Sequence, residues 1–193
     1  MKKIKIIFII FSTLLFVNCN NNKLIEFENL QTNTNFSDTI NITYLEHNSL
    51  NLLDSLIINK YNLIDKSKIQ FSVSSYKNAD CRILNIIKGK EYNILSFIYY
   101  TSEAGDGNPI LKIITYSEDK IIDEISFNLI YCHSPDIEPN QFIVFNSNNE
   151  FSFITRTIKR NLDIIVNEEF KVESDNIKVE KYSIVNGNIK NAS

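Results

Sequence analysis

The residue types best suited to chemistry in this chain are three cysteines and two histidines. Cys132 and His133 are adjacent, whereas His47 is distant in the sequence. A nucleophilic cysteine needs a lowered thiol pKa and a base that a third group orients. Adjacent residues of a strand point to opposite faces, so Cys132 and His133 cannot act together as thiolate and base. We therefore predict no catalytic residues and a protein that is not an enzyme.

Metal and cofactor sites are not predicted either. The histidines and cysteines lack the paired spacing of a four-ligand zinc site. One loop supplies oxygen ligands from Glu103, Asp106 and Asn108, but its spacing differs from that of the EF-hand loop. A hairpin loop in which glycine adopts a positive φ is the simpler interpretation. The chain also has no glycine-rich phosphate loop and no dinucleotide fingerprint, so we expect no cofactor.

The N-terminus has the pattern of an exported precursor. A basic start at residues 1–5 precedes a nearly unbroken apolar run at residues 6–17, which is typical of a secretory signal. The run is shorter than the ~20 apolar residues that a membrane-spanning helix needs. We predict a signal peptide at residues 1–18.

The end of this leader resembles a lipobox, the recognition site of lipoprotein signal peptidase. Its residues are Leu15-Phe16-Val17-Asn18-Cys19, in which Asn18 departs from the usual Ala or Gly. The resemblance implies that Cys19 carries palmitate or a similar lipid and anchors the protein to the membrane. Residues 19–35 then form the lipidated cysteine and a flexible polar tether. Because no acidic cluster follows Cys19, we expect a cell-envelope protein on the outer membrane, facing the periplasm.

Cys81 and Cys132 remain once Cys19 is lipidated, and two hypotheses stay open for them. In an oxidising compartment they could form a disulfide, which would close a loop of ~50 residues and add ~4 kcal/mol of stability. Their apolar neighbours favour the alternative of two small buried hydrophobic residues. Mass measurement with and without reductant distinguishes the two hypotheses.

Composition limits both the architecture and the partners. The chain has 193 residues with 44% hydrophobic residues, which suits a single β-rich domain at residues 36–193. A net charge of −3 and a pI near 5.5 argue against nucleic acid as a partner, because phosphate binding relies on a surplus of Lys and Arg. Only four Gly and three Pro accompany many β-forming residues.

One helix is expected in an otherwise β-rich chain. Apolar residues recur at helical spacing in residues 49–63, and Asn48 or Ser49 is placed to cap the start. Strands are predicted wherever apolar residues alternate or cluster between polar turns. These are residues 38–45, 69–74, 81–87, 92–102, 110–117, 121–131, 141–145, 151–158, 162–172 and 177–185.

The connections between the predicted strands are short and contain turn-forming residues, as in Asn186-Gly187. Short connections require antiparallel neighbours. The predicted fold class is therefore all-β, mainly an antiparallel meander that forms a sandwich or open barrel. The hairpin at residues 111–126 and the segment Glu180-Lys181-Tyr182-Ser183-Ile184 are similar to units of uncharacterised small β-rich lipoproteins of Bacteroidota. That resemblance implies no catalytic residues.

An aromatic group is the candidate for a ligand surface. Tyr99, Tyr100 and Tyr116 would suit a sugar, peptide or lipid if they lay at the mouth of a barrel, although strand aromatics commonly belong to the core. We expect a membrane-anchored, non-enzymatic binding or structural module with an unknown protein or small ligand as partner. The alternatives are an inhibitor or immunity lipoprotein that acts on a toxin or hydrolase, and an enzyme with an unrecognised site.

Overall fold

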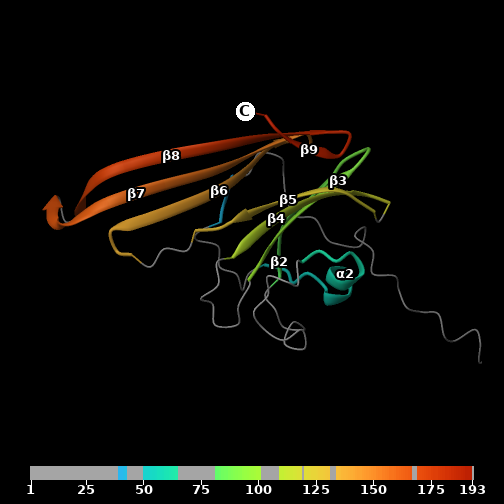
Figure 1. The fold of residues 1–193 in the computed structure, drawn as a ribbon, viewed down its shortest axis with the longest axis horizontal. Helices are drawn as coiled ribbons and strands as arrows, with labels where there is room; N and C mark the ends of the chain where they lie inside the picture. The colour runs from blue at the N-terminus through green and yellow to red at the C-terminus, as the bar shows by residue number, and fades with distance from the viewer. Residues whose placement is uncertain are drawn as a thin grey trace, which may run out of the picture.

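In the part of the chain that the structure describes, the fold consists of two antiparallel β-sheets and one short helix, which confirms the predicted all-β class (Figure 1). The computed structural model describes residues 39–42, 50–64, 81–100, 109–118, 120–130, 134–166 and 169–192. The predicted signal peptide, Cys19 and the tether therefore lie outside the described residues, as does the predicted strand at residues 69–74.

Nine strands of the described residues form the two sheets. The first sheet, sheet A, has the order β1-β6-β7-β8-β9 and consists of β1 (Thr39–Asn41), β6 (Ile137–Ser147), β7 (Glu150–Val166), β8 (Glu169–Val185) and β9 (Asn188–Asn191). Sheet B has the order β2-β3-β4-β5 and consists of β2 (Arg82–Lys88), β3 (Asn93–Tyr99), β4 (Ile110–Ser117) and β5 (Lys120–Asn128). Strands that follow one another within each sheet pair antiparallel, as their short connections require.

The main hydrophobic core lies between the two sheets. Aromatic side chains of both sheets fill its centre: the Phe127 ring stacks on that of Phe153 at 4.4 Å between centroids, and the Phe151 ring stacks on that of Tyr182 at 4.9 Å. Offset stacking of this kind adds to the free energy that the buried apolar area supplies. The packing of sheet A on sheet B is therefore centred on these rings.

A second core lies on the other face of sheet B, under the segment that contains α2 (Ser55–Lys60). Alternate residues of β3 serve the two cores, with Ile94 and Ile98 in the first and Leu95 and Phe97 in the second. The inner strands of sheet B, β3 and β4, are thus buried on both faces. This explains why these two strands have nearly continuous hydrophobic runs in the sequence rather than strict alternation.

The helix is shorter than predicted and begins later. Its N-cap is Asp54, whose carboxylate accepts a hydrogen bond from the Leu56 N–H at 2.7 Å, so the predicted caps Asn48 and Ser49 are wrong. The residues before it instead run beside β2: Leu53 N–H donates to the Cys81 carbonyl at 2.8 Å. The first part of the segment predicted as a helix therefore pairs with residues next to and within β2, although its apolar residues recur at helical spacing.

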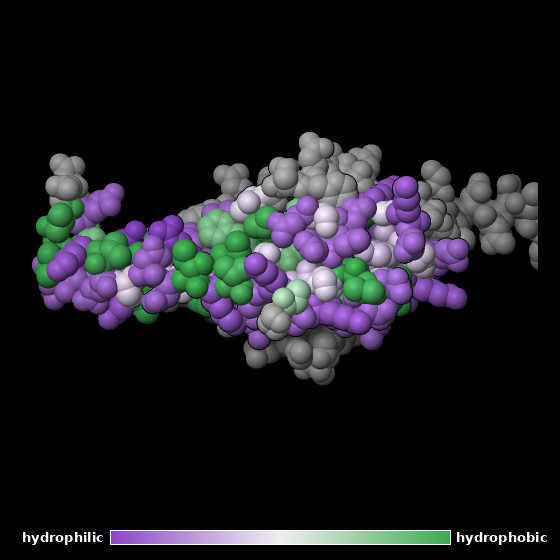
Figure 2. Space-filling view, turned by 90° about the horizontal axis from the view of Figure 1, so that it is seen from above, coloured by the Kyte–Doolittle hydropathy of each residue, from purple (hydrophilic) through white to green (hydrophobic). Residues whose placement is uncertain are grey.

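The largest difference from the predicted strands concerns β7 and β8. These two 17-residue strands form one hairpin in which Val166 pairs with Glu169, so the predicted single strand at residues 162–172 is wrong. Both strands contain polar stretches that interrupt the hydrophobic pattern, but the strands continue through these stretches. The hairpin extends well past sheet B (Figure 1), and Figure 2 looks down on the face of sheet A that is turned away from sheet B.

The turn predicted at Asn186-Gly187 is confirmed and joins β8 to β9. Both residues have positive φ values, 51° and 79°, as in the tight turns that suit a two-residue hairpin. A Cβ atom at Gly187 would lie 2.6 Å from the Cδ1 atom of Ile122. Glycine is therefore needed here for its backbone conformation and for the close approach of β5.

Candidate functional site

Two of the three tyrosines predicted to form a ligand surface are buried. Tyr99 is 3% exposed and Tyr116 is 1% exposed, and both belong to the core under α2. Tyr100, which follows β3, is half-buried. The prediction is corrected for Tyr99 and Tyr116, because the segment that contains α2 covers the face of sheet B on which these two side chains lie.

Cys81 is a free thiol in the same core and is fully buried. It forms no disulfide in the structure, which supports the alternative of a small buried hydrophobic residue; Cys132 lies outside the described residues. Burial raises the pKa of the Cys81 thiol far above its usual range, and nearby Lys112 opposes this only in part. A thiol in this environment remains protonated and is a poor nucleophile.

Cys81 is accordingly expected to resist alkylation in the folded protein. With iodoacetamide at pH 8, the peptide that contains Cys81 should remain unmodified under native conditions and react fully in denaturant. Peptide mass mapping measures the two extents, and the denatured sample serves as the control. Rapid native modification of Cys81 would contradict its burial.

Within the described part of the chain, no cluster of three or more His, Cys, Asp or Glu side chains is placed to hold a metal ion. The same residues contain no helix with the length and apolar character to cross a membrane. The loop with Glu103, Asp106 and Asn108 lies outside these residues, as do His47, Cys132 and His133.

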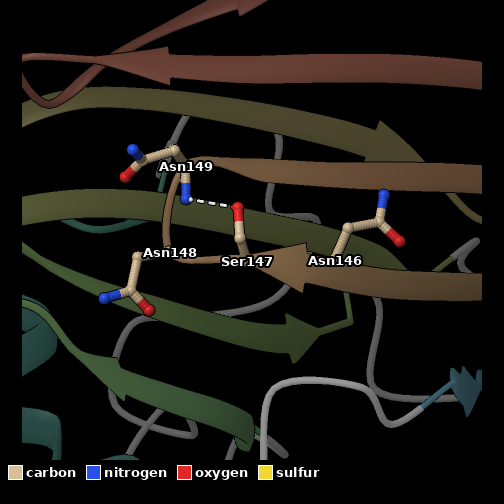
Figure 3. A pocket seen from close by; sticks show the side chains of 4 residues that line it. All are labelled: Asn146, Ser147, Asn148 and Asn149. Carbon is tan, nitrogen blue, oxygen red and sulfur yellow. Dashed lines mark hydrogen bonds between the residues drawn. The ribbon is translucent and has the colours of Figure 1, made fainter.

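A shallow depression of about 400 Å³ lies at the turn between β6 and β7. It is lined by Asn146, Ser147, Asn148 and Asn149, whose side chains point in different directions (Figure 3). Their hydrogen bonds close the turn: Asn149 N–H donates to Ser147 Oγ at 3.1 Å. The Tyr92 hydroxyl donates across to the Asn148 carbonyl at 3.1 Å and to Asn149 Oδ1 at 2.7 Å. These contacts tie the two sheets together and do not form a convergent binding site.

Replacing Tyr92 by Phe should lower the free energy of unfolding by about 1 kcal/mol, because the buried hydrogen bonds to the turn are lost. Burial and, to a smaller extent, Glu91 raise the pKa of Tyr92 above 10. A raised folded-state pKa contributes stability that is complete below about pH 10 and is lost as the pH rises further. Urea denaturation from pH 8 to 11 should therefore show a smaller alkaline loss of stability for Tyr92→Phe than for the wild type. Equal alkaline losses of stability in the two proteins would show that ionisation of Tyr92 does not cause the loss.

The distal part of the β7–β8 hairpin has a high density of exposed hydrophobic side chains. We define the arm as residues 154–166 of β7 and 169–179 of β8, none of which belongs to either hydrophobic core. The structure describes thirteen exposed large hydrophobic residues, and eight lie on the arm. They are Leu162 (38%), Ile164 (41%), Ile165 (67%), Val166 (51%), Phe170 (43%), Val172 (49%), Ile177 (63%) and Val179 (47%). Such a concentration of exposed apolar side chains is typical of an interaction surface.

The register of sheet A places two of these side chains, Ile177 and Val179, on one face. Phe151 and Phe153 point into the core, so Ile154 points to the outer face, away from sheet B. Ile154 lies directly opposite Phe142 on β6 and Val179 on β8, which makes an apolar row across three strands. Ile177 continues the outer face along β8. Figure 2 shows hydrophobic side chains on this face, both along the arm and at its far end.

The charged side chains on the outer face are paired with one another. Arg156 donates two hydrogen bonds to the Asp175 carboxylate, from Nε at 2.9 Å and from Nη2 at 2.5 Å. Arg160 forms a second ion pair with Glu138 on β6. These pairs hold the pKa of Asp175 below its usual range and raise that of Arg156. The outer face of the arm therefore combines exposed apolar side chains with charges that are neutralised locally.

In comparisons with known proteins, no family model, no curated protein and no solved structure matches the chain. The arm is the feature that our sequence analysis missed. One signal could have indicated it, because residues 140–186 contain neither Gly nor Pro, the residues that commonly end strands. A run of that length favours a few long strands over several short ones.

Proposed function

We propose that this protein is a membrane-anchored lipoprotein of the cell envelope that acts as a non-enzymatic interaction module, with the arm as its contact surface. The observation that carries the proposal is the apolar outer face of the arm, where Ile177 is 63% exposed beside Val179 at 47%. Covering such side chains with a partner lowers the free energy by about 25 cal/mol for each Å² of apolar area that is removed from water. This free energy would stabilise a complex in which a partner covers the arm.

The anchor in this proposal is the lipid on Cys19 that the lipobox-like leader implies. The 19 residues between Cys19 and Thr39 would reach at most roughly 65 Å if fully extended. A tether of that reach lets the domain present its arm to partners at a range of distances from the membrane. The fold and the lipid would then have separate roles, one for recognition and one for location.

Two measurements test the proposal in cells that produce the full chain. Labelled palmitate should enter the wild type and fail to enter Cys19→Ser. A photo-reactive benzoylphenylalanine at position 177 on the outer face should form protein adducts, whereas the same group at position 178 should not. Lys178 is the matched control because it is the next residue of β8, is exposed, and points to the opposite face. No palmitate in the wild type, or no adduct at position 177, would refute the corresponding half of the proposal.

The distal end of the arm also favours the inhibitor alternative as a second candidate. Beyond the last paired residue of β6, Ile137, the arm narrows to the two strands β7 and β8, and its end exposes Ile165 and Phe170. A narrow apolar projection suits the cleft of a toxin or hydrolase. If the protein is an inhibitor, Ile165→Asp should abolish inhibition of its target, whereas Ile177→Asp on the broad part of the arm should not.

A further inference from the structure

The outer face of the arm has properties that favour one occupant in particular. Its apolar row (Phe142, Ile154 and Val179) runs directly across three strands, so the surface is broad and sheet-like rather than grooved. Flat sheet faces are commonly covered by other sheets, which pack about 10 Å away with strands aligned to within about 30°. A second sheet with an apolar face is therefore the natural partner.

Charge favours an identical face as that second sheet. Arg156 with Asp175, and Arg160 with Glu138, neutralise each other within one copy. Two such faces can approach without net repulsion between these groups, because each face brings its countercharges with it. A strongly charged partner would gain little here and would compete with pairs that already exist.

The size of the face is close to what self-association requires. The arm has 13 residues of β7 and 11 of β8, which span about 36–43 Å, and two to three strands side by side measure about 10–14 Å, which gives roughly 360–600 Å² per copy. Two copies would thus bury roughly 700–1,200 Å² in total, against the ~1,000 Å² that a specific interface requires. The upper part of this range includes the outer face of β6 beside the arm.

The edge of β8 is a less suitable site for self-association than the face, although it is long. Only Tyr182–Val185 pairs with β9, and Ala192 N–H bonds to the Lys181 carbonyl, which blocks the edge from there onward. A second β8 that stops short of this block must be centred on a residue between 171 and 175. In a regular antiparallel register the centres at 171, 174 and 175 oppose only like charges, such as Asp175 with its own copy, whereas the centres at 172 and 173 also oppose Lys171 with an acidic residue. Like charges therefore act against edge-to-edge pairing in three of the five registers.

A lipid bilayer is also a poor occupant of the arm. Beyond β6 the arm is a two-stranded ribbon, and no described strand pairs with its outer edges. Backbone N–H and C=O groups at those edges would lose their water if the ribbon entered hydrocarbon, at a cost of several kcal/mol for each unsatisfied group. Face-to-face contact between two arms leaves the edges in water.

We propose that two copies of this chain associate through the outer faces of their arms, which forms a local sheet-on-sheet sandwich about a two-fold axis. This inference rests on the proposed function, in which the arm is the contact surface, and names the partner as a second copy. Ile177 and Val179 of each copy lie in the interface, and the arm edges stay exposed.

The photo-reactive group at position 177 of the full chain in cells also tests this inference. We expect an adduct that has twice the mass of the chain and yields peptides of this chain alone on digestion. The same group at position 178 should give no such adduct. An adduct with a different protein would overturn the inference while supporting the proposed function. A lipid adduct would overturn it in favour of the bilayer, and no adduct at all would overturn both proposals.

A charge substitution gives an independent measurement on the purified full chain. Ile177→Glu places two carboxylates, one from each copy, in the interface and should weaken the dimer at least about 100-fold in sedimentation equilibrium. Lys178→Gln, on the opposite face, should leave the dimer unchanged. Because Ile177 is 63% exposed in one copy, circular dichroism should show both variants folded. A wild-type chain that is monomeric at all accessible concentrations, or a dimer unaffected by Ile177→Glu, would refute the inference.

Discussion

Replacing Phe151 by Ala should lower the free energy of unfolding by about 3–5 kcal/mol, which is the usual cost of truncating a buried phenylalanine. Phe151 is 1% exposed at the centre of the core between the sheets. Its ring stacks on Tyr182 at 4.9 Å and lies 5.9 Å from that of Phe145. The truncation leaves a cavity that β-sheets on both sides prevent from collapsing. Urea denaturation followed by circular dichroism measures the change.

Phe170→Ala is the matched control for this substitution. It removes the same atoms from the arm, where Phe170 is 43% exposed, and should change the free energy of unfolding by no more than about 0.5 kcal/mol. Comparable losses for the two variants would mean that the arm, and not only the space between the sheets, belongs to the folded core.

A second large effect is expected at Lys112, a lysine buried in the core under α2. Its side chain is 6% exposed, and its Nζ atom donates to the Leu63 carbonyl at 2.8 Å and pairs with Glu124 Oε2 at 2.8 Å. Lys112→Met should cost about 1–3 kcal/mol, because the buried carbonyl loses its donor. Glu124→Gln should cost about 2 kcal/mol, because it leaves the buried ammonium without its countercharge.

The double variant Lys112→Met with Glu124→Gln distinguishes a coupled ion pair from two separate contacts. With no charge left to bury, it should be more stable than the sum of the single effects predicts, by about 1–2 kcal/mol. Denaturant unfolding of the four proteins completes the cycle. Additive losses would show that Glu124, whose side chain is 49% exposed, contributes no specific stabilisation to Lys112.

Lys112 also shows what the sequence conceals about the packing of the segment at residues 50–64. A lysine within a β-strand gives no local sign that it will be buried. Its burial depends on α2 and Leu63 lying over sheet B, a contact between residues 49 positions apart. The same packing places Cys81 in the core and covers Tyr99 and Tyr116. Predictions about exposed tyrosines failed because they considered each strand without the element that covers it.

The arm was missed for a related reason. Residues 159–161 and 173–176 are mostly polar, and such stretches usually indicate turns. In the structure both stretches continue as paired strands: Lys159 pairs with Ser174, and Arg160 with Val172. Ion pairs such as Lys159 with Glu173 satisfy their side chains across the ribbon. Whether a polar stretch turns or continues depends on its cross-strand partner, which local periodicity cannot show.

The sequence by itself determined the fold class, the antiparallel pairing of successive strands, the turn at Asn186-Gly187 and the presence of a helix within residues 49–63. These properties are local: they follow from alternation over a few residues, from short connections and from the backbone preferences of Asn and Gly. Only the tertiary structure decided where the helix begins, which faces are buried, and that β7 and β8 extend into an apolar arm. Those outcomes depend on contacts between segments that are distant in the sequence. The free energy of such a contact depends on both segments, so it cannot be deduced from either segment alone.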